Sequence, residues 1–441
     1  MADRPQVSGG ESTEKPTRAP RQAAMIFIFV TLFLNILGIG LVIPVLPELV
    51  RGFVGGETAE AGRYYGILVA VYALMQFLFA PMLGALSDRF GRRPVLLISL
   101  LGLGVDYIIM AVAPSLLWLF VGRILSGIMG ASITTANAYI ADISTPATRA
   151  RNFGMVGVAF GVGFVFGPAL GGLLGSIDLR LPFFAAAGLA FVNWLYGFFV
   201  LPESLAEENR SDFSWGKAHP LGSLGVLRSY PLVGGLAGAF VLMNLAQRGL
   251  ESTWVLYTSH RYGWDEKTNG LALALVGIAA VLVQGLVVRP AVARFGERRV
   301  ALFGLGVAIV TQNLYGLAEF GWMVPVIIVI GSLAGLAGPA VQALVAGAVS
   351  PSDQGKVQGA LTSMMSLAAI VAPLTFVSGL FSFFISDRAP VQLPGAPFFL
   401  GSLMMLIAFG VLLRVFRRHP QDIEYAGPAP SDAPGAPRAA E

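Results

Sequence analysis

Long apolar runs alternate with short polar turns along most of this 441-residue chain. The first run, 23–46, is long enough, at about 1.5 Å per residue, to cross a hydrocarbon core about 30 Å thick. The pattern predicts twelve membrane helices near 23–46, 64–86, 94–113, 115–139, 153–174, 181–201, 231–251, 268–289, 299–318, 322–347, 357–382 and 395–416.

Three longer polar segments interrupt this pattern. Residues 1–22 and 417–441 are rich in proline and polar side chains, so we predict disordered tails there. Residues 202–230 form a long polar stretch inside the chain and are predicted to be a linker. The fold class that follows is an all-α membrane protein, with one six-helix bundle at 23–201 and a second at 231–416.

Composition agrees with a polytopic membrane protein. The chain is 55% hydrophobic and only 12% charged, whereas soluble domains are typically about 25% charged. The net charge of +4 does not predict a nucleic-acid partner, because the basic residues lie in short loops rather than on one face. There are no cysteines, which excludes disulfides and thiol catalysis.

The basic residues also predict an orientation. Sixteen Lys and Arg residues fall in loops on one side of the predicted bundles and six on the other. By the positive-inside rule the first side is cytoplasmic, and it carries both tails and the linker. We expect a multi-pass protein of the cell membrane, in a bacterium the inner membrane.

A dense charged turn, which we call the latch, spans Gly84 to Arg93 between the second and third predicted helices. Its glycines should allow close helix approach and a left-handed cap, and Asp88 should cap the next helix. Its arginines should bond carbonyls at a neighbouring helix end. The alternative is a plain positive-inside loop, which needs only the charge. The latch residues are Gly84, Asp88, Arg89, Gly91, Arg92 and Arg93.

The latch pattern G-x-L-x-D-R-x-G-R-R resembles the signature of the major facilitator superfamily. That resemblance implies the major facilitator fold, in which two pseudo-symmetric bundles enclose a substrate site near the bilayer midplane. An internal repeat agrees, because Arg89-Phe90-Gly91 reappears as Arg294-Phe295-Gly296 at an offset of 205 residues. The second copy is degenerate, so we expect the first half to carry most of the gating charges.

A glycine-rich run in the fifth predicted helix concerns the direction of transport. Small residues on one stripe favour close helix packing, and a mid-helix proline favours a kink. Packing alone is one interpretation. The run also resembles the exporter, or antiporter, motif of the superfamily, which implies efflux. Its residues are Gly163, Gly167, Pro168, Gly171 and Gly172.

Within the superfamily, the first half is similar to the tetracycline/proton antiporter branch of drug efflux pumps. The similarity rests on the run from Asn35 to Pro47 and on the residues around Gln76 and Asp106. Two acidic positions of that branch are neutral here, as Asn35 and Ala308. We therefore expect a tetracycline-like substrate to be possible in outline, with weakened binding of the magnesium chelate.

Asp106 and Arg123 are the most deeply placed charges in the predicted helices of the first half. A charge at the bilayer centre costs about 2.5 to 3.5 kcal/mol, so each is expected to have a function or a partner. By helix rise they share a depth on adjacent antiparallel helices. The pair is either a permanent ion pair joining the two helices or a proton-coupling site that opens when the acid is protonated.

Uncharged polar side chains within the predicted helices are candidates for substrate contacts in an apolar cavity. Each could instead form an interhelical hydrogen bond. Arg248 and Glu251, placed by hydropathy near the outer end of the seventh helix, are expected to pair as a gate or rim. The substrate-binding candidates are Asn35, Gln76, Asn137, Gln312, Asn313 and Gln342.

No enzyme chemistry is visible in the sequence. A phosphate-binding G-x-x-x-x-G-K-[ST] motif is absent, and the three histidines lack metal-ligand spacing, so neither cofactor nor metal is expected. The favoured function is proton-coupled antiport that exports an amphipathic drug, with the small molecule, protons and the lipid bilayer as partners of a monomer. The alternatives are uptake of a small metabolite and a receptor or scaffold without turnover.

Overall fold

A computed structural model describes residues 18–211, 231–350 and 353–418, all of which lie in helices or in the turns between them. The first half contains α1 (Arg18–Val42), α2 (Leu46–Phe53), α3 (Thr58–Phe90), α4 (Arg92–Ala111), α5 (Leu116–Gly130), α6 (Ile133–Ile143), α7 (Pro146–Gly175) and α8 (Leu181–Val200). A short 3-10 turn, η1 (Glu207–Asn209), follows. Because apolar side chains cover these helices on nearly all sides, they suit a lipid environment.

The second half repeats this arrangement with more irregular helices. Its elements are α9 (Pro231–Tyr262), α10 (Glu266–Leu282), the π-helix η3 (Val283–Val287), α11 (Val288–Leu317), α12 (Met323–Gly331), the 3-10 helix η4 (Ser332–Leu336), α13 (Ala337–Gly347), α14 (Gln354–Ala372), the π-helix η5 (Pro373–Phe381), α15 (Ser382–Phe384) and α16 (Ala396–Arg418). Several of these follow one another without a break and form single crossings.

The described helices account for the predicted twelve membrane crossings as follows. Ten segments of the described residues are long and apolar enough to cross a membrane. One of them, the 52-residue segment Glu266–Leu317, holds two crossings, because the backbone leaves the helix at Gly296. The 32-residue helix α9 supplies another. The described part of the chain is therefore consistent with twelve crossings.

Several helix ends differ from those predicted. Helix α1 begins at Arg18, inside the predicted tail, and α16 continues to Arg418. Helix α9 ends at Tyr262 instead of residue 251. The reason is that a helix can continue beyond the apolar stretch by which hydropathy detects it. Residues 1–17, 212–230 and 419–441, on which the other tail and linker predictions fall, lie outside the described residues.

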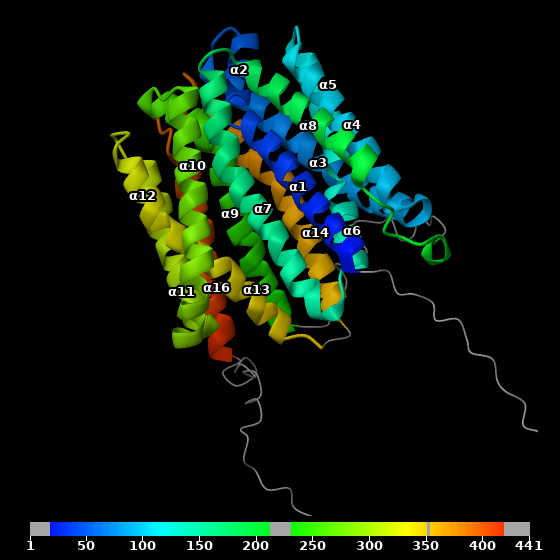
Figure 1. The fold of residues 1–441 in the computed structure, drawn as a ribbon. Helices are drawn as coiled ribbons and strands as arrows, with labels where there is room; N and C mark the ends of the chain where they lie inside the picture. The colour runs from blue at the N-terminus through cyan, green and yellow to red at the C-terminus, as the bar shows by residue number, and fades with distance from the viewer. Residues whose placement is uncertain (1–17, 212–230, 351–352, 419–441) are drawn as a thin grey trace, which may run out of the picture.

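The two halves form two bundles (Figure 1). Helices α3, α4, α5 and α8 lie on one side of the molecule, α10, α11, α12 and α16 lie on the other, and α7 packs directly against α10 between them. The described chain ends, at the start of α1 and the end of α16, lie at the same face as the latch. We call this face the latch side, and the face that carries α2 the opposite side.

The buried core differs between these two sides. On the opposite side one apolar cluster joins both bundles, with Leu46 and Tyr65 from the first and Trp254 and Phe381 from the second. On the latch side there are separate clusters, one within each bundle. The bundles are therefore packed together on the opposite side, and the structure represents a state closed on that side.

Candidate functional site

The latch is built around a glycine whose backbone other residues rarely adopt. Gly91 separates α3 from α4 with φ 100° and ψ 158°, a region occupied almost only by glycine. An added Cβ at this position would also collide with the carboxylate of Glu203. A glycine with positive φ ends α3 as predicted, but its ψ of 158° lies outside the left-handed helical region, so the cap is not the left-handed one expected. Glycine suits both this conformation and the space.

A single arginine gathers the acceptors of the latch. Arg92 is 8% exposed, and its guanidinium pairs with Asp88 and, at 3.1 Å, with Asp142 of α6. It also donates to the Ser87 hydroxyl at 2.7 Å. Buried charges are tolerated when they are paired and hydrogen-bonded in this way. The latch thus fastens α3, α4 and α6 together.

The cap of α4 comes from a distant residue. The backbone N–H groups of Arg92 and Arg93 donate to the two carboxylate oxygens of Glu203, at 2.8 and 3.1 Å. A carboxylate at a helix N-terminus satisfies unpaired N–H groups and complements the helix dipole. The prediction that Asp88 caps this helix is therefore wrong, because Asp88 pairs with Arg92 instead.

The other latch residues have mixed outcomes. Arg93 donates to the carbonyl oxygen of Phe198 at 2.7 Å, near the end of α8, which confirms the predicted bond to a helix-end carbonyl. The Arg89 guanidinium lies 5.2 Å from the ring centre of Phe90. Gly84 has no atom within 4 Å of its Cβ position, so close helix approach at this residue is wrong.

Asp106 lies deep in the first bundle without an ion-pair partner among the described residues. It is 0% exposed, and neither of its carboxylate oxygens accepts a hydrogen bond of normal geometry from that part of the chain, although the Ser126 hydroxyl of α5 lies nearby. Oxygen Oδ1 packs against Gly122 of α5, where an added Cβ would lie 3.0 Å away. An ionised carboxylate here lacks compensation, which favours a bound proton or a rearranged partner.

Arg123 is the nearest candidate for that partner. Its Nη2 lies 2.9 Å from the sulfur of Met110, and its guanidinium lies 5.5 Å from the ring centre of Tyr72. It is close enough to Asp106 for their charges to interact, yet the described residues include no ion pair between the two. A permanent Asp106–Arg123 ion pair is thus not present in this state.

The glycines of α7 contact two different helices. Gly163, Gly167 and Gly171 meet α1, and an added Cβ on Gly167 would lie 2.7 Å from the Gly40 Cα. Gly172 instead meets the backbone of α10, in the second bundle, as does the Pro168 carbonyl. The close packing predicted for this run is confirmed. The helix runs without interruption from 146 to 175, with Pro168 inside it.

The six amide candidates do not all lie together. Gln76 donates to the Gly130 carbonyl and the Tyr72 hydroxyl, both at 3.4 Å, and Tyr72 in turn lies next to Arg123. Asn35 and Asn137 are half-buried in the same bundle. Predictions that these three contact substrate stay predictions.

The amides of the second half are more scattered. Asn313 donates to Ser402 and to the Ile309 carbonyl, which joins α11 to α16. Gln312 is buried against Gly401, and its side-chain oxygen has no partner. Gln342 is exposed on α13. The bonds of Asn313 match the interhelical alternative.

Residues outside the predicted site also take part in the latch or in the space between the bundles. Glu203 and Asp142 complete the latch, although Glu203 falls in the predicted linker and Asp142 falls between the fourth and fifth predicted helices. Arg248 and Glu251 pair at 3.0 Å as predicted, but α9 extends eleven residues past 251, to Tyr262. The pair therefore lies near the middle of the helix, and its place at an outer rim is corrected.

No metal cluster accompanies these groups. Among residues 18–211, 231–350 and 353–418, no three His, Cys, Asp or Glu side chains come together as a metal site. The arrangement offers instead a buried acid, two arginines at mid-depth and an aromatic ring. These are groups that can bind a proton or an organic molecule.

Comparison with known proteins gives consistent relatives. The sequence model of the Major Facilitator Superfamily matches residues 28–373 and 236–438. The class C tetracycline resistance protein of Escherichia coli is 44% identical over 351 residues, which are 80% of this chain and 88% of that protein. The class G protein of Vibrio anguillarum is 39% identical over 399 residues, 90% and 98% of the two chains.

Solved structures share the fold. The human organic anion transporter MFSD10 is 25% identical, covers 89% of this chain and 99% of its own, and superposes with a TM-score of 0.65. The nucleoside transporter NupG superposes with a TM-score of 0.70 over 89% of this chain and 99% of its own. At 12% identity that second likeness concerns the fold alone.

Proposed function

The chain belongs to the major facilitator superfamily, and from that premise we propose that it exports an amphipathic drug in exchange for protons. It is a multi-pass membrane transporter. Its site contains no catalytic constellation, and we propose that it has no enzymatic activity and works as a monomer. The latch side faces the cytoplasm, as the excess of basic residues on that side supports.

The observation that carries proton coupling is the buried, unpartnered carboxylate of Asp106. Its position is fourteen residues into α4, about 21 Å from the helix start and about 8 Å from its end, so it lies within the membrane and nearer the opposite side. A group in this environment is neutral when it holds a proton and uncompensated when it does not. Arg123, one helix away, is the residue that can stabilise the ionised form in another state.

Export, in preference to uptake, is supported by two independent features. The glycines of α7 allow this helix to pack in close backbone contact with α1 and, separately, with α10, and their spacing resembles the antiporter motif. The relatives named above are tetracycline resistance proteins, and a membrane transporter confers resistance to a drug by exporting it, not by taking it up. A scaffold without turnover would not need the buried acid.

We expect this chain to handle the magnesium–tetracycline chelate less well than the tetracycline antiporters do. Asn35 and Ala308 are neutral, so the cavity lacks two negative charges expected of the tetracycline antiporters. At an effective dielectric constant near 20, a charge about 4 Å away contributes up to about 4 kcal/mol before desolvation. We propose weak transport of the cationic magnesium–tetracycline chelate and a gain of it in Asn35→Asp.

Drug accumulation in bacteria that lack their own efflux pumps tests this function. Cells that express the chain should accumulate less of at least one antibiotic or dye from a panel, and a protonophore should abolish the difference. The magnesium–tetracycline chelate should be among the weaker substrates, and Asn35→Asp should increase its export. Equal accumulation with and without the chain across the panel would refute export.

A further inference from the structure

A polar stripe runs along one face of α9. Its members are spaced three or four residues apart, which places them on one face of the helix. The side chains of Arg248 and Glu251 are 50% and 43% exposed, whereas Ala246 and Thr253 on the other face are 0% exposed. The stripe consists of Asn244, Gln247, Arg248 and Glu251.

The stripe lies at the depth of the hydrocarbon core. Arg248 is seventeen residues from Pro231 and fourteen from Tyr262, or about 26 Å and 21 Å from the two ends of α9. An exposed arginine facing lipid at this depth would cost about 2.5 to 3.5 kcal/mol. Such residues face the bundle interior or a water-filled cavity instead.

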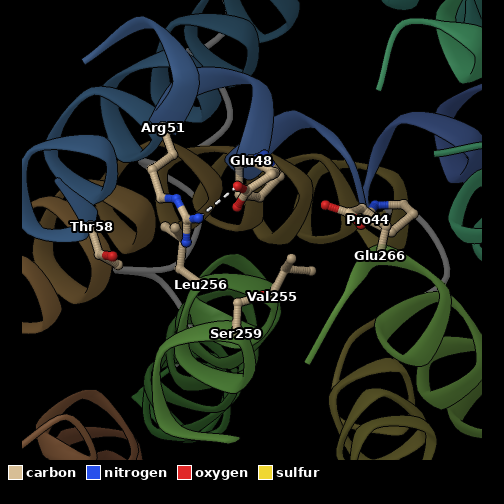
Figure 2. Close-up of a pocket in the computed structure, with 9 residues that line it drawn as sticks. Pro44, Glu48, Arg51, Thr58, Val255, Leu256, Ser259 and Glu266 are labelled. Atoms are coloured by element: carbon tan, nitrogen blue, oxygen red, sulfur yellow. Dashed lines mark ion pairs between the residues drawn. The ribbon is translucent and has the colours of Figure 1, made fainter. Parts of the chain in front are cut away.

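The same face of α9 points to the first bundle. One and two turns further along, Val255 and Ser259 line a small pocket together with Glu48 and Arg51 of α2. Figure 2 shows α2 facing these residues of α9 across the pocket. Since the face that carries Arg248 and Glu251 continues into this contact, the pair lies in the space between the bundles.

The first bundle presents an aromatic ring across that space. Tyr72 of α3 lies within electrostatic reach of Arg248, and α3 and α9 are in contact. The other side of Tyr72 belongs to the coupling site, because the Arg123 guanidinium lies 5.5 Å from the ring centre. The stripe and the coupling site therefore flank the same tyrosine.

Hydrogen bonds leave the arginine, and not the acid, available to a ligand. Gln247 donates to one carboxylate oxygen of Glu251 at 3.1 Å, and Arg248 donates to the other at 3.0 Å. Arg248 uses one of its five N–H donors in this bond, the one bond that the described residues give it. The remaining donors have no protein acceptor among the described residues, and the bond to Glu251 restrains the guanidinium.

We propose that Arg248, held in place by Glu251 and Gln247, binds an anionic oxygen group of the exported compound, such as a carboxylate, sulfonate or enolate. This rests on the proposed function and names a chemical class for its substrate: amphipathic molecules with an aromatic body and one acidic group. Tyr72 offers a surface for the aromatic body. Arginine suits oxyanions because its fixed fork of donors matches their geometry.

Two matched fluorescent dyes test the proposal. 8-Anilinonaphthalene-1-sulfonate and N-phenyl-1-naphthylamine share an aromatic body, and only the first carries a sulfonate. Their binding to the purified chain in lipid nanodiscs is measured, with empty nanodiscs subtracted. Arg248→Gln should weaken binding of the sulfonate about tenfold or more and that of the neutral dye less than about twofold. Arg248→Lys should fall between.

The control is Arg261→Gln, which removes the same charge from the exposed end of α9. It should leave both dyes unaffected. Glu251→Gln separates ligand binding from a structural ion pair, because its amide oxygen can still accept the Arg248 hydrogen bond while the negative charge that competes with the sulfonate is removed. Sulfonate binding should therefore tighten several-fold. A purely structural pair would instead weaken both dyes in Arg248→Gln and in Glu251→Gln alike.

Equal loss of both dyes in Arg248→Gln, or loss of neither, would overturn the proposal. Energised export of the neutral dye from cells, measured separately, reports on the proposed function alone. Export without selective sulfonate binding would refute the role of Arg248 and leave the transporter assignment intact. Sulfonate binding without energised export would refute the coupled function and leave the anion site intact.

Discussion

The two halves of the molecule have the same turn at corresponding positions and use it differently. Gly91 in the first half and Gly296 in the second both have ψ 158°, with φ 100° and 76°. Each is preceded by an arginine stacked on its neighbouring phenylalanine: Arg89 lies 5.2 Å and Arg294 5.6 Å from the ring centre. The backbone turn and this stacking are common to both bundles.

A second arginine–phenylalanine contact is also common to both halves, but the residue before that arginine differs. Arg93 lies over Phe198 of α8, and Arg298 lies over Phe416 of α16, at 5.9 and 5.6 Å. The residue between glycine and that arginine is Arg92 in the first half and Glu297 in the second. The ion-pair network centred on Arg92 is thus added to a shared scaffold, so a switch based on it belongs to the first half.

The strongest test of this difference is Arg92→Gln. It removes the partner of Asp142, Asp88 and Ser87 together, and loss of one member of a buried network leaves the others uncompensated. Transport should fall at least about tenfold, while substrate binding to detergent-purified protein persists. The matched control, Glu297→Gln, should stay within about twofold of the original rate. Equal losses in the two variants would make the halves equivalent.

Replacing the two glycines by alanine sharpens the comparison. Both positions occupy a backbone region that costs other residues roughly 1 to 3 kcal/mol. Gly91→Ala additionally pushes against the Glu203 carboxylate, whereas nothing lies within 4 Å of the Gly296 Cβ position. Thermal unfolding should therefore show a larger decrease in Tm for Gly91→Ala. A larger decrease for Gly296→Ala would contradict the cap by Glu203.

Asp88→Asn should have a smaller effect than Arg92→Gln. The Asp88 side chain is 48% exposed, so solvent screens its pairing with Arg92. We expect turnover to slow about two- to fivefold with ligand binding nearly intact. Ala293 stands where Asp88 would fall in the second half, at the offset of 205 residues. Ala293→Asp, which places an acid there, should not change the rate. Unchanged turnover in Asp88→Asn would mean that the latch sets only the topology of the chain in the membrane and takes no part in gating.

The smallest effect is expected on the opposite side, where the halves meet. Burial raises the pKa of Glu48; Arg51 lowers it and Glu266 of the second half raises it. Since the closed state raises this pKa, protonation favours closure, and that contribution is lost as the pH rises through the raised pKa. Glu48→Gln should stay closed at higher pH.

Spin labels at Glu57 and Lys267, both exposed, report on this closure. Cysteines can be introduced there without background, because the chain has none. The fraction with a short distance should decrease between pH 5 and pH 8 in the original chain and change less in Glu48→Gln. An identical pH dependence in both would exclude Glu48 as the titrating group.

Most of the crossings could be predicted from the sequence because they are long apolar runs. The sequence was less informative about helix ends, since α9 continues to Tyr262 on residues that are no longer strongly apolar. That error placed Arg248 at a rim instead of mid-membrane. The depth of Arg248 could not be predicted because the full length of α9 was unknown.

The latch was partly predictable for a related reason. The glycine turn and the arginine–carbonyl bond depend on neighbours in the chain or on any nearby helix end. The cap by Glu203 joins residues 111 positions apart, so only the packed bundle reveals it. The depth of Asp106 and Arg123 followed from helix rise. Their separation did not, because Arg123 lies against Met110 and Tyr72.

Gradient-driven transport by Asp106→Asn tests the central claim, proton-coupled export, most directly. Proteoliposomes are prepared with the original chain and with the variant, using a substrate found in the accumulation screen. The original chain should accumulate it against its gradient when a pH gradient is imposed. The variant should only exchange it, because asparagine imitates the protonated acid and cannot release a proton. Full gradient-driven accumulation by Asp106→Asn would contradict the account and move coupling elsewhere, with Glu251 as the next candidate.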